Sequence, residues 1–96
     1  MNISKKNNIT ITKLKQFYLE DGDVLHALKS NENEYKGFQE AYFSKVNPNK
    51  IKAWKRHLKM TMNLIVPVGN VQFIFYDKNK NFIDNIVIGE SNYSRI

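Results

Sequence analysis

The sequence contains no cysteine, which excludes disulfides, thiolate metal sites and a thiol nucleophile. Neither a disulfide-stapled secreted scaffold nor a cysteine enzyme is therefore possible. No apolar run approaches the ~18 residues of a helical membrane span. Residues 1–8 are rich in Asn and Lys and lack the apolar stretch of a signal peptide. We therefore expect a cytoplasmic protein.

Proline and glycine are also scarce, with 2 and 4 residues, and the chain has no Pro/Gly/Ser-rich linker, repeat or low-complexity tract. A chain of 96 residues with 42% hydrophobic and 25% charged residues is typical of one small folding domain. We expect a single domain over residues 1–96, with residues 1–8 flexible.

Positive charge is unevenly distributed along the chain. The net charge is +6, and residues 45–59 hold six Lys and Arg side chains with no acidic residue. Such a cluster is compatible with nucleic-acid binding. A/T-rich codons would produce the same Lys-, Asn- and Ile-rich composition without any polyanion partner, so both interpretations stay open.

Hydrophobic periodicity predicts an all-β fold. Residues alternate with the period of a strand, or form β-branched and aromatic runs, over 9–12, 38–45, 71–76 and 82–88. Turn-forming residues separate these runs at 21–23, 46–49, 67–70 and 77–81. Residues 24–35 are compatible with a helix or with extended chain. Many short strands with close turns favour an antiparallel sandwich or barrel.

A strand over residues 51–62 would place His57 between Lys55 and Lys59 on one face, and Trp54 on an opposite, core-like face. The flanking cations should lower the pKa of His57 and keep the imidazole neutral, as a general base requires. The alternative is that these side chains form the solvated outside of a sheet.

Aromatic side chains interleave with basic ones, as in single-strand nucleic-acid platforms, but their strand positions favour packing in a core. These residues are Tyr42, Phe43, Trp54, Phe73, Phe75 and Tyr76. The second histidine, His26, has no metal-ligand spacing to His57. We expect no metal and no cofactor.

Five segments together resemble a known enzyme family. Residues 37–44 (GFQEAYFS), 51–57 (IKAWKRH), 66–71 (VPVGNV), 76–77 (YD) and 88–93 (IGESNY) are similar to the cupin-type nucleotide-sugar epimerases, relatives of dTDP-4-dehydrorhamnose 3,5-epimerase. The match is closest to a short bacterial branch with a Lys-x-Trp-His-Arg-His signature. This resemblance spans most of residues 20–96.

The resemblance implies a cupin-like jelly-roll β-barrel that acts on a dTDP-4-keto-6-deoxy sugar in surface-polysaccharide biosynthesis. The activity needs no metal or cofactor. By position, His57 is similar to the family's general base, and Glu40, Tyr42, Lys55, Lys59 and Asn63 to its substrate-contacting side chains. The catalytic acid is open, with Tyr42 and Tyr76 as candidates by residue type.

The sequence departs from the family pattern in three places. Lys55 stands where the branch has its first histidine, and Asn63 lies near a family lysine. The family pattern also continues beyond Ile96, so we expect a barrel lacking its last strands and completed as a homodimer. The alternatives are a non-catalytic sugar-nucleotide-binding cupin and, less favoured, a small basic nucleic-acid-binding β-barrel.

Overall fold

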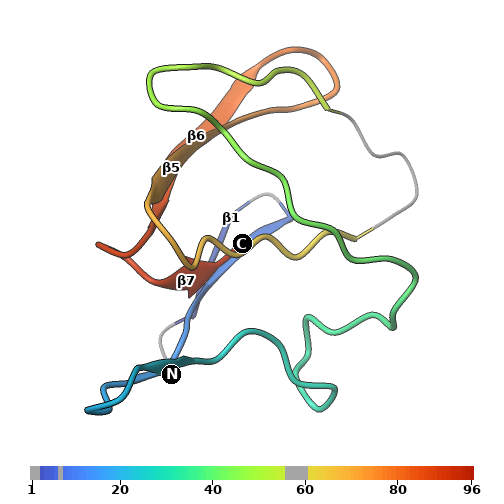
Figure 1. Cartoon of the computed structure of the whole chain (residues 1–96). Helices are drawn as coiled ribbons and strands as arrows, with labels where there is room; N and C mark the ends of the chain where they lie inside the picture. The colour runs from blue at the N-terminus through green and yellow to red at the C-terminus, as the bar shows by residue number, and fades with distance from the viewer. Residues whose placement is uncertain (1–2, 7, 56–60) are drawn as a thin grey trace. The chain divides into compact units, whose positions relative to one another are not determined.

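The computed structural model describes the backbone of residues 3–6 and the whole of residues 8–55 and 61–96 (Figure 1). Every regular element in these ranges is a β-strand, which confirms the all-β prediction. The strands are β1 (Ile3–Lys6), β2 (Ile9–Lys13), β3 (Gln16–Phe17), β4 (Val24–Leu25), β5 (Asn70–Tyr76), β6 (Phe82–Gly89) and β7 (Ser94–Arg95). Nowhere in the described ranges is there a helix that could span a membrane.

The chain divides into two compact units. Unit 1 comprises Met1–Ala27 and Asn63–Ile96, and unit 2 is the intervening segment Leu28–Met62. All seven strands belong to unit 1. Their pairings give one three-stranded sheet, β1-β2-β7, and two hairpins, β3-β4 and β5-β6. The described strands thus form three small antiparallel sheets and no closed barrel.

The end of the chain is the best-buried part of unit 1. Thr12 of β2 pairs with Arg95 of β7, and Leu14 continues the ladder by donating to the carbonyl of Tyr93 over 3.0 Å. On the other side, the amide and carbonyl of Leu64 exchange hydrogen bonds with those of Ile96 at 2.8 and 3.1 Å. Residues 93–96 therefore have a hydrogen-bonded segment on each side, residues 12–14 on one and Leu64 on the other.

The β5-β6 hairpin shows the alternation that the sequence predicts. Val71 and Phe73 pair with Ile88 and Ile86 on its inner face, where both isoleucines are buried. On the opposite face, Ile74 pairs with Asn85 and stays exposed. The turn at 77–81 forms because Asp77 Oδ1 accepts hydrogen bonds from the amides of the second and fourth residues after it.

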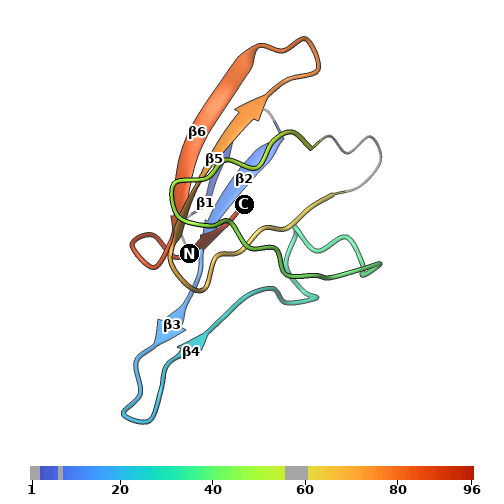
Figure 2. The same ribbon diagram turned by 45° about the horizontal axis from the view of Figure 1, so that its top comes forward.

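A short hairpin that the sequence analysis missed, β3-β4, contains the predicted turn at 21–23 (Figure 2). Its turn is held by the amide of Gly22 on the carbonyl of Leu19 and by Asp23, which accepts from the amide of Leu19. The strands are only two residues long, so alternation has too few positions to reveal them. Beyond β4 the chain is extended or in turns, which settles the open question at 24–35 against a helix.

The predicted strand at 38–45 is wrong, because no strand forms there and every side chain in it is exposed. Residues 51–55 and 61–62, from the predicted strand at 51–62, are not in a strand either. A strand needs a partner to satisfy its backbone groups, and alternating side chains do not supply one. The core packing expected for Tyr42, Phe43 and Trp54 is wrong as well, since all three rings are exposed.

Two segments that carry the family resemblance meet beside Gly89. The amide of Gly69 donates to the Glu90 carboxylate at 2.6 Å, and the Glu90 amide returns a bond to the Gly69 carbonyl at 2.8 Å. Asn70 Oδ1 accepts from both the amide and the hydroxyl of Ser91. A Cβ on Gly89, whose φ is 151°, would collide with the Gly69 carbonyl oxygen and lie 2.6 Å from the Asn70 Cα.

We predict that Gly89→Ala destabilises unit 1 by at least about 3 kcal/mol, because backbone strain and a backbone collision add. Gly22→Ala is the matched control, since its φ of 134° is also positive but its Cβ would have nothing within 4 Å. The control should lose about 1–2 kcal/mol. Urea unfolding of both variants measures the difference, and equal losses would contradict the collision.

Candidate functional site

The proposed base and one proposed cation lie outside the described residues. His57 and Lys59 belong to residues 56–60, which the structure does not describe. Of the remaining predicted site residues, Glu40, Tyr42 and Lys55 lie in unit 2, and all three are exposed. Asn63 begins the second part of unit 1 and is half-buried.

The structure brings two of these predicted residues together. The Lys55 ammonium lies 5.6 Å from the centre of the Tyr42 ring. A cation within about 6 Å of a ring face is attracted by the ring's electron density. This contact leaves the ammonium accessible to an anionic ligand, because both residues remain exposed.

A second lysine is held a few residues away. Lys52 Nζ donates to the Ser44 hydroxyl at 2.6 Å and to the Lys45 carbonyl at 3.2 Å. The intervening turn is closed by the amide of Lys50 on the carbonyl of Asn47, as predicted for 46–49. The contacts therefore join residues at increasing distance on the two sides of this turn. The two flanking segments lie opposite each other but do not form a strand ladder.

Lys52 was not singled out from the sequence, although a signal for it was present. The predicted turn at 46–49 makes the chain reverse, so residues just before it must face residues just after it. Counting outward from the turn places position 44 opposite 51 and position 42 opposite 53, within one or two positions of Lys52 and Lys55.

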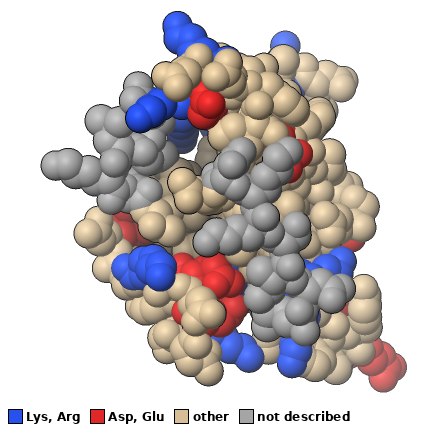
Figure 3. Space-filling view, turned by 180° about the vertical axis from the view of Figure 1, so that it is seen from behind, with Lys and Arg blue, Asp and Glu red and all other residues tan. Residues whose placement is uncertain are grey.

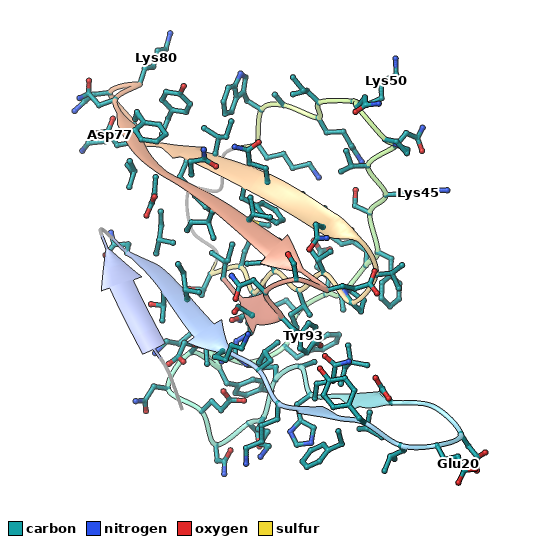
Figure 4. All side chains as sticks on the ribbon, turned by 90° about the vertical axis from the view of Figure 1, so that its left-hand side faces the viewer. Glu20, Lys45, Lys50, Asp77, Lys80 and Tyr93 are labelled. Carbon is teal, nitrogen blue, oxygen red and sulfur yellow. The ribbon has the colours of Figure 1, made fainter. Side chains whose placement is uncertain are left out.

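Unit 2 holds most of the excess positive charge. Lys and Arg outnumber Asp and Glu eight to three between residues 28 and 62. Lys45 and Lys50 extend away from its ribbon (Figure 4), and Lys and Arg side chains reach solvent on the face in Figure 3. The exposed aromatic rings Phe38, Phe43 and Trp54 are 72%, 102% and 71% exposed. Unit 2 thus offers cations for phosphates and rings for stacking.

The other histidine is part of a different arrangement in unit 1. The His26 ring lies 5.2 Å from that of Phe17, and its backbone carbonyl accepts a 2.7 Å hydrogen bond from the Tyr93 hydroxyl. Arg95, 1% exposed, donates to the carbonyl of Ala27 at 2.6 Å. Among the described side chains, no three His, Asp or Glu residues group closely enough to hold a metal ion.

Burial raises the pKa of Tyr93 above the usual value for tyrosine. Figure 4 shows this side chain beside β7. The folded state therefore keeps the phenolic proton at pH values where the unfolded chain releases it. The stabilisation is complete below the ordinary tyrosine pKa and is lost as the pH rises through the folded value.

Comparison with known proteins gives no assignment: no family model, curated protein or solved structure matches this chain.

We predict that the free energy of unfolding falls more steeply above pH 10 in the unsubstituted chain than in Tyr93→Phe, which cannot release a phenolic proton. Tyr18→Phe is the control, because Tyr18 is 78% exposed. Urea unfolding between about pH 8 and 11 measures the slopes. Identical slopes for the chain and Tyr93→Phe would contradict the role of Tyr93 burial.

Proposed function

We propose that this chain is a cupin-type nucleotide-sugar epimerase or isomerase that acts on a dTDP-4-keto-6-deoxy sugar. The proposal includes a jelly-roll topology and a homodimer, and it rests on the resemblance of five sequence segments. The observation that supports it best is the contact between Tyr42 and Lys55, because two residues taken from separate segments of that resemblance meet. Lys55 is also two positions from the proposed base.

In the proposed reaction, the imidazole of His57 takes the proton from the carbon next to the ketone. The electron pair of the broken C–H bond forms the double bond of an enolate, whose charge moves to the former ketone oxygen. Lys59 stabilises this oxyanion, Lys55 binds the diphosphate, and Glu40, Tyr42 and Asn63 orient the sugar. Return of a proton to the opposite face of the carbon gives the epimer.

The two flanks of the turn at 46–49 support this division of roles. Tyr42 and Ser44 lie on one flank, and Lys52 and Lys55 lie on the other. A diphosphate binds at a lower entropy cost when the lysines that contact it are already held in place, because long side chains lose conformational freedom when binding orders them. The contacts of Lys52 and Lys55 restrict both side chains before any ligand arrives.

We predict that the protein exchanges the C3 or C5 proton of dTDP-4-keto-6-deoxyglucose for deuterium in heavy water. His57→Asn should slow the exchange by about 100-fold or more, because a positioned general base contributes that much. Proton NMR of the sugar follows the signal loss. His26→Asn is the matched control and should retain the activity of the unsubstituted protein.

The outcomes separate catalysis from binding alone. Line broadening of the sugar without exchange would favour the non-catalytic cupin that keeps the nucleotide-sugar site. Exchange that survives in His57→Asn would refute the assignment of the base. Neither exchange nor broadening would refute both sugar hypotheses for this substrate.

A second candidate function, binding of single-stranded nucleic acid, is favoured by one specific observation. The sequence pattern favours core packing for the aromatic residues of unit 2, but the rings of Tyr42, Phe43 and Trp54 are exposed, and lysines lie close to them in the sequence. Exposed rings can stack with bases of any sequence while lysines neutralise phosphates. Because these rings are not in strands and not buried, the reason for expecting them in a core no longer applies.

If this second function holds, a labelled single-stranded oligonucleotide of about 15 nucleotides should bind, as fluorescence anisotropy can measure. Neutralising four phosphates would weaken binding by about 50-fold between 50 and 200 mM salt. Trp54→Ala should weaken it about 10-fold through lost stacking, whereas Tyr18→Ala, an exposed aromatic of unit 1, should not. Equal effects of the two substitutions, or no binding at low salt, would count against this function.

A further inference from the structure

Three residues at the end of the chain, Tyr93, Arg95 and Ile96, bind the chain just before and just after unit 2. His26 and Ala27 immediately precede unit 2, and Leu64 and Ile65 follow just after it. The side chains of Tyr93 and Arg95 bind the first pair of residues, through the carbonyls of His26 and Ala27. The backbone of residues 95–96 binds the second pair, through the bridge from Arg95 to Ile65 and the two Leu64–Ile96 hydrogen bonds.

The residues that make these attachments are among the best buried of those that the structure describes. Tyr93 and Arg95 are 5% and 1% exposed; Arg95 lies in β7, which pairs with β2, and the Tyr93 carbonyl accepts a hydrogen bond from the amide of Leu14. A buried guanidinium must keep its hydrogen-bond partners, because leaving a buried charge uncompensated is costly. The Ala27 carbonyl is one such partner, so the position of the chain at residue 27 depends on Arg95.

Unit 2 has no buried core among its described residues, since not one of them is buried. Its contacts include turn hydrogen bonds and interactions of exposed lysines. Holding the two ends of such a segment close together supplies the entropy cost of closing the loop in advance and leaves the segment fewer conformations. Residues outside unit 2 therefore contribute to its order.

We infer that Tyr93 and Arg95 are positioning residues that, with the backbone of residues 95–96, hold the two ends of unit 2 and thereby order the proposed substrate-binding side chains. The effect on the structure of unit 2 does not depend on the proposed function. The expected effect on proton exchange of the sugar rests on the proposed function.

The absence of cysteine allows this inference to be tested without removing native thiols. Spin labels on Lys29→Cys and Thr61→Cys, both exposed positions of unit 2, report the distance between its ends by pulsed electron paramagnetic resonance. We expect a single narrow distance peak in the otherwise unsubstituted chain. Tyr93→Phe and Arg95→Met should each lose that peak and give a broad distribution.

Ser94→Ala is the matched control, because Ser94 is buried between the two positioning residues but its hydroxyl donates to Asn92. It should keep the narrow peak. If Arg95→Met does not fold, Tyr93→Phe, which removes a single oxygen atom, still tests the inference. A broad distribution in the unsubstituted chain, or a narrow peak retained in Tyr93→Phe and in any folded Arg95→Met, would overturn it.

Deuterium exchange of the sugar, measured on the same variants without labels, separates the two proposals. Loss of the narrow peak in a protein with no sugar activity supports the positioning role and leaves the proposed function refuted. Sugar activity together with an unchanged peak overturns the positioning role alone. If both proposals hold, Tyr93→Phe should raise KM more than it lowers kcat, because a loosened segment weakens substrate contacts first.

Discussion

The hydrogen bonding of residues 93–96 is the constraint on which the rest of the structure depends. These residues pair with β2 on one side and with Leu64 and Ile65 on the other, and their side chains reach His26 and Ala27. A strand bonded on both sides satisfies its backbone groups away from water. Thr12, Ser94 and Arg95 are buried although all three are polar, because no buried side-chain nitrogen or oxygen among the described residues lacks a hydrogen-bond partner.

The core around this strand is small, with Leu14, Ile86, Ile88 and Tyr93 as its buried hydrophobic residues. A core of this size gives limited stabilisation from apolar burial, so polar contacts with defined geometry become correspondingly important. The exchange of hydrogen bonds between Gly69 and Glu90 is one of them, and the close approach that it needs leaves no room for a side chain at position 89.

The sequence predicted those parts of the fold in which local pattern and tertiary pairing agree. Alternation at 71–76 and 82–88 flanks a turn that Asp77 can close, so each strand has its partner nearby. The same alternation at 38–45 failed, because no strand pairs with it and nothing buries its apolar positions. Periodicity indicates which face a strand would bury, but the existence of a partner is decided elsewhere in the chain.

The site was predictable to a similar extent. The turn at 46–49 and the resemblance together predicted residues on its two flanks, and Tyr42 and Lys55 are in contact. Two-residue strands and hydrogen bonds such as those of Tyr93 and Arg95, whose partners lie 67 and 68 positions away, leave no periodic trace. Their identification needed the structure.

The arrangement of the lysines bears on which ligand unit 2 suits. A groove for single-stranded nucleic acid tracks an extended backbone, so its cations should be spread along a line. In unit 2, Lys52 and Lys55 lie on one flank of a single turn, and both contact residues of the opposite flank. Under the proposed function, these two lysines would meet the two adjacent phosphates of a nucleotide sugar. The exposed rings are the feature that keeps nucleic acid as its competitor.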